Sequence, residues 1–154
     1  MVYVNGDILT PVTDDRPTIV CHQVNCKGVM GSGLAKQVRE KFPGVYGSYK
    51  GRCEAPYDNL GQVQICSVLS ETGYLIANVF GQRNYGGALK NTNYRALRKA
   101  FSFIADAYPL YTIRIPYKMG CGLGGGDWAI VEEIILETLH DKGVNVEIWR
   151  FRHE

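Results

Sequence analysis

Hydrophobic and polar positions follow two different periods along the chain, and the changes between them predict its elements. Apolar runs rich in β-branched residues are typical of strands, and they lie at 2–4, 18–24, 62–69, 74–80, 111–115 and 144–151. Apolar positions at helical spacing predict helices that begin near Leu34, Val45, Tyr94 and Trp128. The turn signal Glu71-Thr72-Gly73 predicts a hairpin between the third and fourth strands.

This order of elements predicts an α/β fold. Strands and helices alternate with one inserted hairpin, which indicates a mixed sheet with helices on both faces. At 154 residues, the chain has the usual size of one domain, so we expect a single domain over residues 1–154. Ligands of such sheets bind at the carboxyl ends of the strands. The loops that follow the strands are therefore the first candidates for a functional site.

Two of these loops are rich in glycine, and each leads from a strand into a helix. The first covers residues 25–33, and the second has five glycines within residues 120–126. A strand, a glycine loop and a helix start together expose backbone N–H groups to an anion at the positive end of a helix dipole. Glycine lets the backbone approach a phosphate because no Cβ stands between them. Two such loops at one crevice predict a diphosphate site.

Composition and charge exclude several other classes. The formal net charge of +2 is too small to indicate nucleic acid or a membrane as an electrostatic partner. No apolar run approaches eighteen residues, and the N-terminus lacks the pattern of a secretory signal. The five cysteines show no C-x-x-C spacing, which favours reduced thiols over a zinc or redox site. We expect a cytoplasmic protein without a metal or cofactor.

Two common phosphate-binding motifs fit poorly. A Walker A loop requires Lys followed by Ser or Thr after its last glycine, but Leu34-Ala35 follow Gly33. A Rossmann unit requires an acidic residue at the end of a strand about twenty residues after its glycines. Glu54 lies near that distance, but the segment 49–53 before it lacks a strand pattern. Neither motif explains the two loops.

Three segments together resemble the macrodomain family of ADP-ribose-binding modules: Asn5-Gly6-Asp7-Ile8, residues 24–35 and residues 115–128. Within that family, the chain looks most like the branch of terminal ADP-ribose glycohydrolases and of bacterial antitoxins that remove ADP-ribose from DNA. The resemblance extends from about Val2 to Phe151. It implies a three-layer α/β/α macrodomain with a mixed, mostly parallel central sheet.

The resemblance also implies which residues bind the ligand. Asp7 and Ile8 match the pair that contacts adenine, and Asn25 matches the residue that reaches the distal ribose. The first loop, beside the distal ribose and one phosphate, is matched by Val29, Met30, Gly31, Ser32, Gly33 and Leu34. The second loop, around the diphosphate, is matched by Gly120, Cys121, Gly122, Leu123 and Gly124. Cys121 stands where the family usually has a small packing residue.

The catalytic lysine of the related glycohydrolases has no counterpart in this chain. If one residue is inserted, Gln82 occupies its position. A glutamine hydrogen-bonds a ribose but cannot form a Schiff base or supply a positive charge. A second-loop aspartate used in this branch is matched by Gly124, and Asp127 follows three residues later as a helix cap or a base. The candidate catalytic residues are therefore Asn25, Gln82 and Asp127.

Two functions remain open from the sequence. The first is hydrolysis of an ADP-ribose derivative at its distal ribose: an ADP-ribosylated protein or DNA, O-acetyl-ADP-ribose or ADP-ribose 1''-phosphate. A water held between a phosphate and the ribose replaces the lysine in that case. The second is a non-catalytic reader of ADP-ribosylation. We favour the hydrolase, because a free-standing domain has little to do with a ligand except change it. The low charge implies DNA as a partner only when it is ADP-ribosylated.

Overall fold

The computed structural model describes residues 1–86 and 90–151, and six strands of this part form one sheet. The strands are β1 (Val2–Asn5), β2 (Thr18–Val24), β3 (Val63–Ser67), β4 (Tyr74–Phe80), β5 (Thr112–Pro116) and β6 (Asn145–Arg150). Their spatial order is β1-β6-β5-β2-β4-β3. All neighbours pair in parallel except β3 and β4, which pair antiparallel. The sheet is therefore mixed and mostly parallel, as expected.

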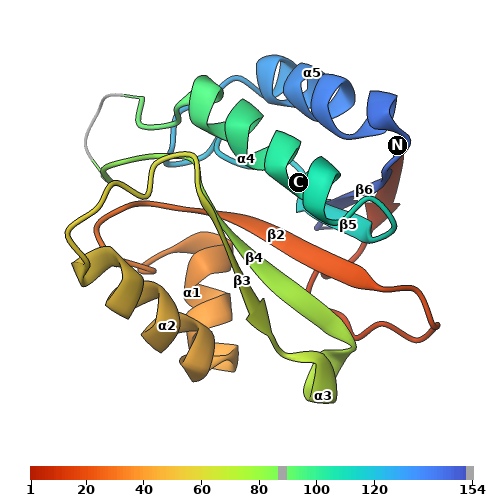
Figure 1. Cartoon of the computed structure of the whole chain (residues 1–154), viewed down its shortest axis with the longest axis horizontal. Coiled ribbons are helices and arrows are strands. Elements are labelled where there is room, and N and C mark those ends of the chain that lie inside the picture. Colours follow the sequence, from red (N-terminus) through yellow and green to blue (C-terminus); the bar gives the residue numbers. More distant parts are fainter. Residues whose placement is uncertain (87–89, 152–154) are drawn as a thin grey trace.

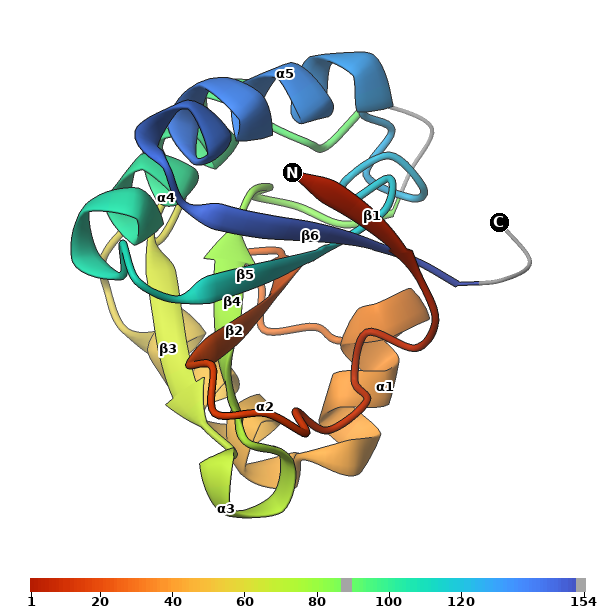
Figure 2. The ribbon, with the colours of Figure 1, turned by 90° about the vertical axis from the view of Figure 1, so that its right-hand side faces the viewer.

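Helices cover both faces of this sheet and complete the three layers. One face is covered by α1 (Gly33–Lys41) and α2 (Pro43–Glu54), and the other by α4 (Tyr94–Ala107) and α5 (Trp128–Thr138) (Figure 1). Figure 2 shows the sheet between the two layers from the side. The short η1 (His140–Lys142) follows α5. No helix among the described residues has the length and apolar character needed to cross a membrane.

β2 lies in the middle of the sheet, which explains its nearly continuous apolar sequence. Its side chains alternate between the two faces. Ile19 and Cys21 belong to the core beneath α4 and α5, whereas Val20 packs with residues of α1 and α2. Two polar side chains interrupt the pattern near the end of the strand, with His22 toward α1 and α2 and Gln23 toward α4 and α5.

The predicted hairpin is confirmed, but its turn differs from the expectation. The strand expected over 62–69 ends at Ser67, and α3 (Leu69–Thr72) forms one helical turn before β4. Gly73 ends this turn with a φ of 78°, a left-handed conformation that favours glycine. The second helix begins at Pro43 and not at Val45. Proline suits a first helical turn, because no hydrogen bond is required of its nitrogen there.

The parallel strands bring four loops to one edge of the sheet. β1, β2, β4 and β5 all run in the same direction. The described residues of the loops that leave their carboxyl ends are 6–17, 25–32, 81–86 with 90–93, and 117–127. The parallel pairing thus brings both glycine loops and the Asp7 segment to the edge where α/β sheets bind ligands.

Candidate functional site

The first glycine loop is folded around the side chain of Asn25, which is almost fully buried. Its Oδ1 accepts a hydrogen bond from the backbone N–H of Lys27 at 2.9 Å, and its Nδ2 donates to the carbonyl of Val29 at 2.8 Å. The Tyr49 hydroxyl on α2 lies 2.7 Å from the Asn25 carbonyl and 2.8 Å from Oδ1. Burial raises the pKa of Tyr49, so this hydroxyl remains a donor. Asn25 therefore determines the shape of the loop.

The end of this loop leads into α1 with exposed backbone. Gly31, Ser32 and Gly33 are exposed, whereas Met30 is buried beneath them. Ser32 occupies the N-cap position of α1 but makes no side-chain cap hydrogen bond. The first N–H groups of the helix thus remain available to an anion, and the helix dipole favours a negative charge there.

The second glycine loop is fixed by side chains from other elements. The Thr92 hydroxyl donates to the Gly120 carbonyl at 2.6 Å, and the N–H groups of Asn91 and Thr92 donate to the Gly124 carbonyl. Gln23 of β2 donates from its Nε2 to Thr92 Oγ1 at 2.9 Å. The loop is therefore tied to the segment before α4 and, through Thr92, to the central strand.

The glycines of the second loop have unequal surroundings. A Cβ added to Gly120 would lie 2.7 Å from Gln23 Oε1, and one added to Gly124 would lie 2.5 Å from Thr92 Oγ1. Neither position has room for a side chain. A Cβ on Gly122 would meet no heavy atom within 4 Å, so only this glycine of the three faces open space. The backbone around Gly122 is the accessible part of the loop.

Gln82 connects the two loops. Its Oε1 accepts from Gln23 Nε2 at 2.6 Å, and its Nε2 donates to the Asn84 carbonyl at 2.7 Å. Its carbonyl lies 3.5 Å from the thiol of Cys26 in the first loop. The next residue, Arg83, also contacts the first loop, because its carbonyl accepts from the Cys26 N–H at 3.1 Å. Gln82 thus contacts the first loop directly and reaches the second loop through Gln23 and Thr92.

The Asp7 segment is held by a buried arginine of β5. Asp7 is exposed, and its Oδ1 accepts from the N–H of Leu9 at 2.9 Å. Arg114 donates to the carbonyls of Ile8 at 3.0 Å and of Thr10 at 2.7 Å. Burial lowers the pKa of Arg114, while Glu147, 3.9 Å from its Nε, opposes that shift. These contacts fix the backbone beside Asp7 while its carboxylate faces solvent.

The two remaining predicted residues have structural contacts. Asp127 caps α5, because its Oδ1 accepts from the Ala129 N–H at 2.9 Å, and its own N–H donates to the Tyr94 hydroxyl. The Cys121 thiol lies 3.4 Å from the carbonyl of Met119, and burial raises its pKa. Asp127 thus has the contacts of a helix cap, and Cys121 has the surroundings of a packing residue.

Several residues of this region had no counterpart in the sequence-based prediction. They are Gln23, Thr92, Tyr49, Arg114 and Phe151. Gln23 and Arg114 could have been noticed in the sequence, because each is a polar residue inside an otherwise apolar strand. A buried polar side chain needs hydrogen-bond partners. Phe151 is 51% exposed and directly follows Arg150, whose carbonyl accepts from the Gly6 N–H at 2.9 Å. An exposed aromatic ring therefore lies next in the chain to the residue that pairs with the Asp7 segment.

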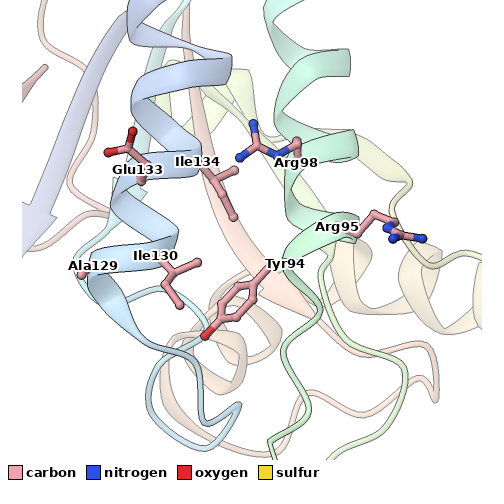
Figure 3. Close-up of a pocket in the computed structure, with 7 residues that line it drawn as sticks. All are labelled: Tyr94, Arg95, Arg98, Ala129, Ile130, Glu133 and Ile134. Carbon is pink, nitrogen blue, oxygen red and sulfur yellow. The ribbon is translucent and has the colours of Figure 1, made fainter.

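One hollow of the structure lies between two helices of the same layer. A groove of about 600 Å³ runs between α4 and α5, with Ile130 and Ile134 on one side and Tyr94 and Arg98 on the other (Figure 3). None of the predicted site residues lines it. Among the described residues, no group of three His, Cys, Asp or Glu side chains is placed to hold a metal ion.

No protein-family model matches the chain, but comparison with known proteins finds similar sequences and structures. A DNA ADP-ribosyl transferase–DNA ADP-ribosyl glycohydrolase fusion protein of Thermosipho africanus is 27% identical over 142 residues, which cover 82% of this chain and 36% of that protein. An ADP-ribose 1''-phosphate phosphatase of Scheffersomyces stipitis is 39% identical over 54 residues, or 34% of this chain and 31% of that protein. These matches thus span about a third of each curated relative.

A solved structure matches over nearly its whole length. The macrodomain protein of Streptomyces coelicolor is 30% identical to this chain and superposes with a TM-score of 0.78. The match covers 96% of this chain and 97% of that one.

Proposed function

The chain belongs to the macrodomain family, and from this premise we propose that it binds ADP-ribose and hydrolyses an ADP-ribose derivative at the distal ribose. One observation carries the proposal: two glycine loops with accessible backbone follow the parallel strands β2 and β5 at the same edge of the sheet. The names of the two curated relatives, an ADP-ribosyl glycohydrolase fusion and an ADP-ribose 1''-phosphate phosphatase, support a hydrolase over a reader. We also propose that residues 1–154 form one macrodomain.

The proposed pose follows the contacts of the three loops. The diphosphate lies between the N–H groups that begin α1 and the open backbone around Gly122. The Asp7 carboxylate accepts from the exocyclic amine of adenine, and the N–H of Ile8 meets the ring. The distal ribose then lies toward Asn25 and Gln82, at the junction of the two loops.

Hydrolysis at this position proceeds without a lysine. Water adds to the anomeric carbon while the bond to the leaving group breaks, and a phosphate of the ligand accepts a proton from the water. The positive charge that develops on the ribose is stabilised by the nearby diphosphate, which the two loops hold in place. Asn25 contributes by fixing the first loop, since its amide binds both Lys27 and Val29. Asp127 stays a secondary candidate because its Oδ1 already caps α5.

The experiment compares binding with turnover. Calorimetry with ADP-ribose should give binding to the wild type and none to Gly122→Glu, whose carboxylate would stand where a phosphate must lie. Release of ADP-ribose from ADP-ribosylated DNA, ADP-ribosylated protein, O-acetyl-ADP-ribose and ADP-ribose 1''-phosphate should then identify the substrate. Gly51→Glu is a suitable control, because it adds the same charge at an exposed position of α2 with no heavy atom within 4 Å.

The possible outcomes separate the two functions. Binding without release from any of the four derivatives would favour the reader and contradict the hydrolase. Absence of binding at millimolar ADP-ribose would contradict both functions. Equal binding by Gly122→Glu and the wild type would contradict the placement of the diphosphate.

A further inference from the structure

We infer that Gln23 and Thr92 are positioning residues, which turn the side-chain amide of Gln82 so that its nitrogen and not its oxygen serves the ligand. The inference rests on the proposed function, because it assigns Gln82 a part in that site. Gln23 lies on β2 and Thr92 lies just before α4, so neither belongs to a glycine loop. Together with Gln82 they form a relay of hydrogen bonds that ends on a backbone carbonyl at each side.

The first end of the relay determines the orientation of Gln23. A backbone carbonyl oxygen only accepts hydrogen bonds, so Thr92 Oγ1 donates its single proton to the Gly120 carbonyl 2.6 Å away. The same oxygen must then accept from its other neighbour, the Gln23 amide, at 2.9 Å. The Gln23 nitrogen therefore faces Thr92.

The second end of the relay determines the orientation of Gln82. Gln23 Nε2 uses its other proton toward Gln82, whose side-chain oxygen accepts at 2.6 Å. Gln82 Nε2 donates to the Asn84 carbonyl at 2.7 Å, and this carbonyl also only accepts. The two carbonyls therefore lead to one arrangement, in which the Gln23 nitrogen faces Thr92 and the Gln82 oxygen faces Gln23. Flipping either amide would set two acceptors or two donors against each other.

The surroundings of Gln23 leave it little room to move. Its Oε1 is buried without a hydrogen-bond partner among the described residues. A Cβ added to Gly81 would lie 2.5 Å from this oxygen, and one added to Gly120 would lie 2.7 Å from it. Both glycines therefore provide the space that the Gln23 amide occupies. The amide is enclosed between the end of β4 and the start of the second loop.

The relay leaves one donor of Gln82 for the ligand. Its Nε2 carries two protons, of which one binds the Asn84 carbonyl. The other has no acceptor among the described residues, and the side chain is only half-buried. Gln82 therefore offers the distal ribose a hydrogen-bond donor. It does not act as a base toward water, because an amide oxygen is too weakly basic to take the proton.

A donor at this place favours substrates joined to the ribose through oxygen. Water adds to the anomeric carbon as the bond to the leaving oxygen breaks, and the electron pair of that bond stays on the leaving oxygen. The proton lost by water passes to the phosphate of the ligand, and solvent protonates the leaving group. A donor directed at the leaving oxygen stabilises the negative charge that develops there. Esters and the 1''-phosphate meet this requirement better than a link through nitrogen.

The test uses a pair of substitutions at Thr92. Thr92→Val removes the hydroxyl at similar volume, and Thr92→Ser keeps it. We expect Thr92→Val to lower kcat on ADP-ribose 1''-phosphate about 10-fold, the usual effect of losing one hydrogen bond, here the one from Gln82 to the ligand, with KM changed less than about 3-fold. Thr92→Ser should stay within about 2-fold of the wild type. Thr138→Val is the matched control, because Thr138 also donates a buried hydroxyl to a carbonyl, at the far end of α5.

A second readout does not depend on turnover. The side-chain amide of Gln82 gives a proton–nitrogen NMR signal, which is identified by its loss in Gln82→Glu. ADP-ribose should shift this signal in the wild type and in Thr92→Ser but not in Thr92→Val. Gln23→Leu breaks the relay at the next residue and replaces Thr92→Val if that variant does not fold.

The outcomes distinguish this inference from the proposed function. A wild type that binds no ADP-ribose would overturn the proposed function and the relay with it. A wild type that binds ADP-ribose, with Thr92→Val equal to Thr92→Ser in kcat and in the NMR shift, would overturn the relay alone. Equal losses of kcat in Thr92→Val and Thr138→Val would also overturn it, because they would indicate a general loss of stability.

Discussion

The two glycine loops look alike in the sequence, but their glycines have different neighbours. In the second loop, Gly120 and Gly124 lie against Gln23 and Thr92 so closely that a Cβ would lie 2.7 Å or less from one of their polar atoms. In the first loop, a Cβ on Gly31 would meet only Val29, at 3.6 Å. The second loop thus needs glycine at these two positions for its packing, whereas Gly31 and Gly33 of the first loop are exposed.

The two loops also differ in where the residues that hold them in place come from. The first loop is fixed from within, by the amide of Asn25, with support from Tyr49. The second loop is fixed from outside, by Thr92 and, behind it, Gln23. Both arrangements start from the carboxyl end of β2, which carries Gln23 and leads into Asn25. One central strand therefore positions both halves of the proposed diphosphate site.

The largest expected effect comes from adding a methyl group to the second loop. Gly124→Ala should lower the free energy of unfolding by about 3 kcal/mol, because the new Cβ would lie 2.5 Å from Thr92 Oγ1 and 2.7 Å from the Gly120 carbonyl. Thermal unfolding should show a fall in Tm of roughly 10 °C. Gly122→Ala is the control within the same loop and should cost less than about 0.5 kcal/mol. Similar losses in both variants would contradict the packing difference.

Acid should lower the free energy of unfolding through His22, which lies on the face of β2 that packs against α1 and α2. His22 is buried with its Nε2 2.5 Å from Asn78 Oδ1, and burial lowers its pKa to about 4. An unfolded histidine has a pKa of about 6.5, so the unfolded state binds more protons between these two values. Stability should therefore fall as the pH falls, by about 2 kcal/mol between pH 6.5 and 5.

Urea unfolding at a series of pH values measures this effect. His22→Gln should flatten the pH dependence over the same range, because a glutamine does not titrate. Gln23 and Thr92, on the other side of the sheet, carry no titrating group, so their own hydrogen bonds do not depend on pH. An unchanged slope in His22→Gln would show that other groups cause the acid sensitivity.

The smallest effect is expected from the anchor of the first loop. Tyr49→Phe should cost about 1 kcal/mol, because it removes the hydroxyl that lies between the Asn25 carbonyl and Oδ1. Hydrogen exchange at the Val29 N–H should become faster, and exchange at the Gly126 N–H, which binds the Gly120 carbonyl, should not. Tyr74→Phe removes a similar buried hydroxyl, bound to the Leu9 carbonyl, and should leave Val29 unaffected. Faster exchange in both loops would mean that they are not anchored separately.

The sequence alone determined the order of the elements and the place of both loops. Runs of β-branched residues and helical spacing identified the strands and the main helices, because burial imposes these periods on any chain. Glycine and proline marked where the elements end. The short helix α3 was missed, since four residues are too few to show a helical period. The resemblance to macrodomains then predicted the ligand and the residues that contact it.

Only the tertiary structure decided which side chains hold the predicted site residues in place. Gln23 and Thr92 are 69 positions apart in the chain, and Arg114 and Ile8 are 106 positions apart. No local pattern connects such pairs, because their contact depends on which strands become neighbours in the sheet. The glycines of the two loops also look alike in the sequence. Their difference arises from the side chains that pack against them, and those come from distant parts of the chain.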